Sequence, residues 1–243
     1  MLSLFGWTLS VRFRLQKKTK PVVVNQKLQD SLLKTYSQYN EDIFLWQLFE
    51  GKKSGYYVDI GANDPIKLSN TKKFYDMGWT GVTVEPNPKL YRRICEHRTR
   101  DMNLNCGVGD VPGKMTFYEI DPDCYSTFDP KIAKMTKFSS SKKVIAELPI
   151  KIITINEIFE LCKQPVDFLS LDTENFDYKV LSVNDWSKNR PKVIVVELNH
   201  DEDSKVYELL KQQMYELIFF NGTNGIFVAE EYASGFVAPK EVA

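Results

Sequence analysis

The stretch Gly55-Tyr-Tyr-Val-Asp-Ile-Gly61 is a short apolar run that closes on a glycine, and it sets the pattern for the rest of the chain. Residues 69–77 follow with a serine at the cap position and a glycine directly after them, so they are predicted to form a helix. A second apolar run, Gly81-Val-Thr-Val-Glu85, comes next. Strand, glycine turn, helix and strand together form one unit of a parallel sheet.

The alternation continues as far as residue 213. Further strands are predicted over 103–108, 115–120, 150–154, 166–172 and 193–197, and further helices over 89–98, 155–162, from 178 onward and over 204–213. Residues 215–220 and 226–229 flank a turn rich in Asn and Gly, which is typical of an antiparallel hairpin. Right-handed crossovers between buried strands predict a doubly wound α/β fold with a mostly parallel sheet.

Residues 121–148 interrupt this alternation. The segment is polar and rich in lysine, and prolines stand at positions 122 and 130. We expect an irregular excursion from the core, which serves either as a lid over a substrate or as a solvated loop, with Ser126 and Thr127 among the lid candidates.

Charge is balanced over the whole chain but not along it. The 243 residues hold 32 basic and 32 acidic side chains, yet residues 1–36 hold seven basic side chains and one acid, which leaves the remainder at minus six. A balanced chain argues against a nucleic-acid partner, and no run of about 18 apolar residues offers a membrane span. We therefore expect a basic segment over 1–35 and one domain over 36–243. Residues 1–20 are either a peripheral contact with an anionic membrane or a frayed terminus.

Cysteines and histidines argue against a metal or a disulfide framework. The four cysteines include no CxxC pair, and only two histidines are present. These counts favour a reducing, cytoplasmic compartment and predict no metal ion.

Polar residues stand at the ends of the predicted strands, where ligands bind in open α/β sheets. They are Asp59, Gly61 and Asn63; Glu85 and Asn87; Asp172, Glu174 and Asn175; and Glu197 and His200. The three-glycine pattern that lets a pyrophosphate approach a helix is missing after the first strand.

A nucleoside with a cationic reactive end fits these groups better than a dinucleotide. Glu85 follows Gly61 by twenty-four residues, about where a carboxylate accepts both hydroxyls of a ribose. S-adenosyl-L-methionine has such a ribose, has an ammonium group for Asp59, and has no pyrophosphate. The alternative for Asp59 or Glu85 taken singly is an ordinary turn or cap residue.

Taken together, these residues resemble the FkbM-type S-adenosylmethionine-dependent methyltransferases. The resemblance is carried, over residues 36–230, by Ser37-Gln38, Glu41-Asp42, residues 57–65, Ser69-Asn-Thr71, Gly78-Trp79, Gly81-Val82, Glu85-Pro-Asn-Pro88, Arg100-Asp101, Asn103-Leu-Asn105, Ser126-Thr-Phe128, residues 166–174, Val180-Leu181 and residues 190–193. It implies a class I, Rossmann-like methyltransferase fold with a seven-stranded sheet. It also implies a cofactor site around Asp59, Gly61, Asn63, Glu85 and Asn87, and O-methylation of a sugar, a glycan or a secondary metabolite.

One residue departs from the family pattern. Asn175 stands where the family has a glycine after Asp172-Thr-Glu174. Asparagine tolerates a positive φ better than most residues, so we expect the turn to survive.

Methyl transfer to an alcohol needs a base for the acceptor proton. Asp172 and Glu174 are candidates from the resemblance, and His200 is a candidate because its ordinary pKa, about 6.5, suits the role. Each has another reading: Asp172 caps a helix, Glu174 pairs with Lys179 or Arg190, and His200 is a turn residue. The carboxylates with His200 also suit a divalent cation.

Two other classes of function stay open. One is a nicotinamide-dependent oxidoreductase, against which the missing glycine fingerprint and the lack of a Tyr-x-x-x-Lys pair argue. The other is a protein that keeps the fold but only binds its ligand, for which Asn175 is the hint.

Overall fold

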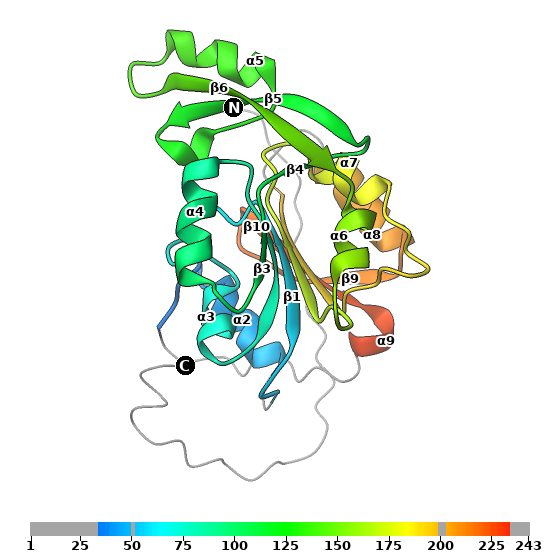
Figure 1. The fold of residues 1–243 in the computed structure, drawn as a ribbon. Helices are drawn as coiled ribbons and strands as arrows, with labels where there is room; N and C mark the ends of the chain where they lie inside the picture. The colour runs from blue at the N-terminus through cyan, green and yellow to red at the C-terminus, as the bar shows by residue number, and fades with distance from the viewer. Residues whose placement is uncertain (1–33, 50–51, 199–202, 234–243) are drawn as a thin grey trace.

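The computed structural model describes residues 34–49, 52–198 and 203–233. Its main sheet has seven strands in the order β3-β2-β1-β7-β8-β10-β9. Their bounds are β1 Tyr56–Ile60, β2 Thr80–Val84, β3 Met102–Leu104, β7 Phe168–Leu171, β8 Val193–Glu197, β9 Tyr215–Phe220 and β10 Asn224–Ala229. Strands β3, β2, β1, β7 and β8 are parallel, and β10 is antiparallel to both of its neighbours. The predicted doubly wound sheet with a C-terminal antiparallel hairpin is confirmed (Figure 1).

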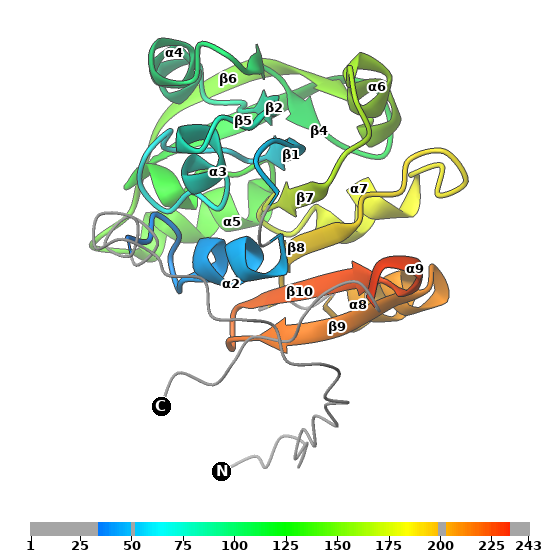
Figure 2. The same cartoon turned by 90° about the horizontal axis from the view of Figure 1, so that it is seen from below.

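Helices cover both faces of this sheet, as Figure 2 shows from below. The helices are α2 Glu41–Leu48, α3 Lys72–Asp76, α4 Pro88–His97, α5 Pro130–Met135, α6 Ile155–Leu161, α7 Asp177–Ser182, α8 Asp203–Gln212 and α9 Glu230–Ala233. On one face, α2 and α3 bury an aromatic cluster that includes Phe74, Trp79 and Phe168. On the other face, α6, α7 and α8 bury aliphatic side chains. Because both faces are covered, all four residues of β7 are buried.

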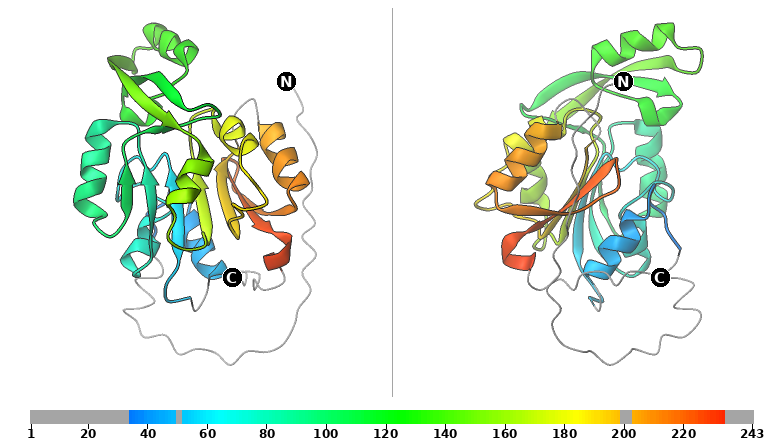
Figure 3. Two further views of the ribbon diagram at one scale, coloured as in Figure 1. Left: turned by 45° about the vertical axis from the view of Figure 1, so that its right-hand side comes forward. Right: turned by 180° about the vertical axis from the view of Figure 1, so that it is seen from behind.

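A second, three-stranded sheet lies across the carboxyl ends of the parallel strands (Figures 1 and 3). It consists of β4 Gly107–Val108, β6 Lys143–Ile153 and β5 Gly113–Asp121. Between β5 and β6 the chain forms two short 3-10 helices, η1 Asp123–Tyr125 and η2 Thr136–Phe138, on either side of α5. These elements place the excursion over the edge of the sheet at which ligands bind in this class of fold.

Several elements differ from the sequence prediction, among them helices α5 and α9, which were not predicted. The strand expected over 103–108 is two strands in two sheets, β3 and β4. Strand β6 begins at Lys143, seven residues before the strand expected at 150–154, so the end of the excursion is regular. Helix α2 was not predicted. No helix in the described ranges is long and apolar enough to cross a membrane.

Candidate active site

A cavity of about 420 Å³ opens where the parallel strands end. The ends of β1, β2, β7 and β8 form its floor, and residues 123–128 of the excursion form its roof. It lies beside the point where the strand order reverses, between β1 and β7, which is the usual ligand crevice of a doubly wound sheet. Among the described residues that line it, none carries a positive charge, whereas five are acidic: Glu85, Asp123, Asp172, Glu174 and Glu197.

Gly61 makes the turn after β1 in a conformation that only glycine adopts without cost. Its φ is 81°, and a Cβ atom built on it would lie 1.8 Å from the backbone oxygen of Asp172. The amide of Gly61 donates to the carbonyl of Val84 at 3.0 Å. The glycine therefore lets the loops after β1 and β7 lie against each other under the cavity.

Glu85, directly after β2, has a carboxylate held in place by backbone groups. Its two oxygens accept hydrogen bonds from the amides of Asn63 and Asn87, each at 2.8 Å. Burial raises the pKa of Glu85 to about 7, against the effect of these two amides. An ionised carboxylate has about four acceptor positions, so two remain for hydroxyl groups of a ligand in the cavity.

Asn63 and Asn87 complete this corner of the cavity. Asn63 lines the cavity with φ at 48°, a left-handed conformation that aims its amide at Glu85. The side chain of Asn87 caps α4 by accepting from the amide of Lys89 at 2.9 Å. Both residues thus hold Glu85 through backbone amides, and both line the cavity as the sequence suggested.

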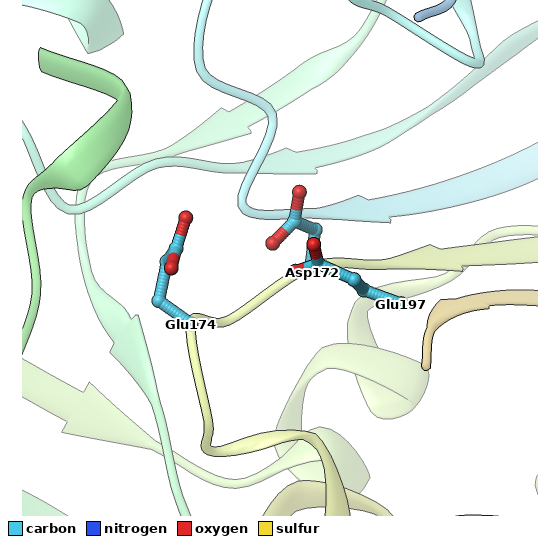
Figure 4. A group of neighbouring side chains, drawn as sticks. All are labelled: Asp172, Glu174 and Glu197. Carbon is cyan, nitrogen blue, oxygen red and sulfur yellow. The ribbon is translucent and has the colours of Figure 1, made fainter. Parts of the chain in front are cut away.

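Asp172, Glu174 and Glu197 surround one space at the ends of β7 and β8 (Figure 4). One oxygen from each of the three carboxylates lies within 4.8 Å of the others. Asp172 is exposed to the open cavity. Partial loss of hydration between the cavity walls, followed by the neighbouring charges of Glu197 and Glu174, raises its pKa above the ordinary value. Carboxyls this close either share protons or bind a hard divalent cation.

The loop after β7 takes a left-handed path through Glu174 and Asn175. Their φ angles are 50° and 77°. Asn175 therefore adopts the positive φ expected where the family has a glycine, and the turn is preserved. The hydroxyl and the amide of Thr173 donate to Asp177 at 2.9 and 3.1 Å, so Asp177 fixes the loop at the start of α7.

The roof of the cavity is held to the second sheet. Tyr118 in β5 exchanges two backbone hydrogen bonds with Thr127, at 2.9 and 3.1 Å. The ring of Phe128 lies between those of Phe117 and Phe176, with centroids 5.0 and 6.2 Å away. Residues 123–128 thus cover one side of the cavity, whereas residues 129–143 extend away from the body (Figure 3). That the segment serves as a lid over a substrate stays a prediction.

Asp59 lies under the cavity and does not line it. Its side chain is 4% exposed and accepts a hydrogen bond from the hydroxyl of Thr71. Arg98, itself 1% exposed, also donates to Thr71 and offsets the buried charge of Asp59. The predicted contact of Asp59 with a cofactor stays a prediction, and the observed contact of its carboxylate is with Thr71, directly before α3.

The other predicted site residues fall into three groups. Asp172 and Glu174 lie together in the cavity, and Arg190, a suggested partner of Glu174, instead forms an ion pair with Glu231 at 2.5 Å. His200 lies outside the described residues. Glu197 was noted only as a strand-end residue, although its position in the strand next to β7 was the signal that would have placed it beside Asp172.

Gln38 also lines the cavity, and the sequence gave no specific role for it. Asp42 accepts hydrogen bonds from the amide of Tyr36 and the hydroxyls of Thr35 and Ser37, which fixes the chain just before α2. These bonds connect Ser37 with Asp42 across the residue that lines the cavity, Gln38.

The family described as "Methyltransferase FkbM domain" matches residues 59–217. No curated protein matches the sequence.

Solved structures with a similar fold include three methyltransferase or RNA-processing proteins. A TehB-like SAM-dependent methyltransferase from Corynebacterium glutamicum has a TM-score of 0.44 at 9% identity, covering 79% of this chain and 88% of that one. A putative RNA methyltransferase from Pyrococcus horikoshii has a TM-score of 0.38 at 10% identity, covering 89% and 94%. The Methanococcus jannaschii fibrillarin pre-rRNA processing protein has a TM-score of 0.38 at 12% identity, covering 79% and 76%.

Proposed function

Because the chain belongs to the FkbM methyltransferase family, we propose that it transfers a methyl group from S-adenosyl-L-methionine to a hydroxyl group of a sugar, a glycan or a secondary metabolite. The observation that carries this proposal is the cavity at the strand ends, with Glu85 at one end and the three carboxylates at the other. The donor, when bound, supplies an electrophilic methyl group on a sulfonium. The chain's own residues must position both partners and accept one proton.

Glu85 is the residue that we assign to the donor's ribose. Two acceptor positions of its carboxylate are free of backbone amides and suit a pair of vicinal hydroxyls. Gly61 and Asn63 form the adjoining wall, and the close contact of Gly61 with the backbone of Asp172 fixes that wall against the loop after β7. The acidic lining as a whole favours a ligand with net positive charge.

Asp172 is the residue that we assign as the general base. Its raised pKa brings a carboxylate, which is normally too weak a base, toward the pH at which it accepts a proton efficiently. Glu197 and Glu174 favour the protonated form of Asp172 and therefore stabilise it after it has taken the acceptor's proton. His200 remains a candidate for the same role.

The walls of the cavity also bear on the acceptor. An acceptor with a phosphate or carboxylate near the reacting hydroxyl would meet five acidic side chains and no described basic one. The aromatic side chains of Phe117, Tyr125 and Phe128 provide apolar surface of the kind that packs against sugar rings. We therefore favour a neutral polyhydroxy acceptor.

The four cysteines, all free in the structure, agree with a cytoplasmic location.

Calorimetry and turnover assays test the proposal. The purified full chain should bind S-adenosylmethionine and not NAD, and labelled methyl donor should mark a saccharide or an extract component. Glu85→Ala should abolish donor binding, with the exposed Glu147→Ala as its matched control. No heat with the donor at concentrations well above micromolar would reject the proposal.

The base assignment has its own test. Asp172→Asn should bind the donor normally and lose turnover, whereas the exposed Asp110→Asn should keep both. Turnover should also persist in the presence of a chelator. If EDTA abolishes it and Mg²⁺ restores it, the three carboxylates bind a cation and the base is elsewhere.

A further inference from the structure

The segment between η1 and β6 presents an apolar and basic surface away from the body of the molecule. We refer to residues 129–143 as the tip; it contains α5 and η2 (Figure 1). Met135 is 71% exposed and Phe138 is 93% exposed, the largest exposure among the described large apolar side chains. Full exposure of a phenylalanine is unfavourable in water unless something covers it.

The tip is folded, so this exposure is a property of its structure. Asp129 caps α5 by accepting from the amide of Lys131 at 2.7 Å. The hydroxyl of Thr136 donates to the carbonyl of Ala133 at 2.7 Å, and Ala133 is buried. The buried side of the segment is thus already occupied, and Met135 and Phe138 are left on the other side.

The charge of the tip is as unusual as its apolar surface. Residues 129–143 contain five lysines and one aspartate, whereas the chain outside the tip and residues 1–36 has 20 basic and 30 acidic side chains. Lys131, Lys134 and Lys143 are exposed. An open groove of about 520 Å³ is lined by Asp121, Thr136, the three serines that follow Phe138, Lys142, Lys143 and Val144, so two lysines outnumber one acid there. Hydroxyls and ammonium groups of this kind suit an anionic head group.

We propose that the tip docks on an anionic lipid membrane, with Phe138 and Met135 inserted among the acyl chains and the lysines against the head groups. Apolar side chains ringed by lysines are the typical composition of an interfacial anchor. A nucleic acid or an acidic protein would also match the lysines, but a membrane takes up Phe138 and Met135 together among its acyl chains without a dedicated pocket for either. The acidic body repels the same membrane, so among the residues that the structure describes it is the tip that faces it.

Vesicle co-sedimentation of the full chain tests this docking. The protein should bind vesicles of mixed phosphatidylcholine and phosphatidylserine more tightly than vesicles of phosphatidylcholine alone. Phe138→Ser should weaken the binding about tenfold, and Lys131→Ser with Lys134→Ser should weaken it about 25-fold, since each lysine near a charged surface gives about fivefold. Thermal unfolding should be unchanged, because these side chains are exposed.

The matched controls replace the same residue types outside the tip. Phe220→Ser replaces a phenylalanine that is 48% exposed in β9, and Lys188→Ser with Lys211→Ser removes two exposed lysines. Neither should change the binding. Because residues 1–36 are the same in every variant, any contribution from them cancels in the comparison.

Three results would overturn the proposal. The first is no dependence on phosphatidylserine. The second is binding that the tip variants leave unchanged, which would assign it to another part of the chain. The third is binding that needs the lysines but not Phe138 and that heparin reproduces, which would make the tip a site for polyanions. None of these results bears on methyl transfer.

Discussion

Glu85 combines a buried carboxylate with two backbone donors, and this combination makes ligand binding depend on pH. With its pKa raised to about 7, the group is partly protonated at neutral pH in the free protein. Ribose hydroxyls donate to the ionised form. Donor affinity should therefore fall as the pH drops below about 7, by up to about tenfold per pH unit. Calorimetry at several pH values checks this, and Glu85→Gln should bind more weakly with no such dependence.

Gly61 should tolerate no side chain. Gly61→Ala places a Cβ 1.8 Å from the Asp172 carbonyl oxygen, in addition to the cost of φ at 81°. We expect the free energy of unfolding to fall by about 3 kcal/mol or more. Gly78→Ala is the matched control, because φ is 98° there but nothing lies within 4 Å, so it should cost only about 1 kcal/mol. Urea unfolding measures both, and equal losses would contradict the close contact.

Asn175 shows how far a single residue could be predicted. A positive φ was expected at Asn175 because it stands where the resembling family has a glycine, and the structure has φ at 77° there. The neighbouring positive φ of Glu174 could not be predicted, because a glutamate carries no local signal for it. Asn175→Gly should raise the free energy of unfolding by about 1 kcal/mol at most and keep methyl transfer, whereas loss of turnover would give the asparagine side chain a role in the site.

At the scale of elements, Glu41 connects α2 to the turn between β9 and β10. Its side chain is fully buried and accepts from Asn221 and Asn224 at 2.7 and 2.6 Å, and from the amide of Tyr39 at 2.8 Å. Glu41→Ala leaves these donors unpaired and should cost about 3 kcal/mol. The exposed Glu208→Ala in α8 should cost less than about 0.5 kcal/mol. Equal urea midpoints for the two variants would contradict this role.

The elements that were predicted well are those with covered faces. The strands β1, β2, β7 and β8 are mostly apolar and almost wholly buried, and their ends gave most of the site. Strand β6 was placed too late because exposed and partly buried residues alternate from Lys143 to Pro149, so no apolar run marks its start. It is a strand because it pairs with β5 over nine positions, a long-range contact that the sequence does not display.

At the scale of the whole molecule, the order of strands and helices along the sequence predicted the topology of the main sheet, but it did not predict the second sheet. The split between β3 and β4 depends on which sheet each short strand joins. The lid over the cavity was similarly undecided between a solvated loop and a cover, since its position depends on the pairing of Tyr118 with Thr127.

Several buried acids make the stability of the ligand-free protein fall as pH rises. Burial raises the pKa of Glu85 to about 7 and those of Asp101 and Asp177 to about 6. Each group is protonated more readily in the folded state, so its stabilisation is full below the unfolded value near 4 and is lost as the pH passes 6 to 7. Acids with lowered pKa, such as Asp64, are fully ionised throughout this range and do not oppose the trend.

Urea unfolding at pH 5 and pH 8 measures this effect. We expect a loss of a few kcal/mol between the two values. Glu85→Gln should reduce the difference, while Glu147→Gln, at an exposed position, should not. A urea midpoint that is higher at pH 8 than at pH 5 would contradict the expected trend, because it would show that these carboxyls are hydrated or paired in solution.

The acidic lining of the cavity also has a consequence for the end of the catalytic cycle. Loss of the methyl group turns the sulfonium into a neutral thioether, so the spent donor has one positive charge fewer than the fresh one. Walls with five acidic side chains attract the charged form and hold the neutral form less tightly. In the proposed reaction, transfer of the methyl group thus weakens the electrostatic attraction between the cavity and the spent donor, which favours its release before the next turnover.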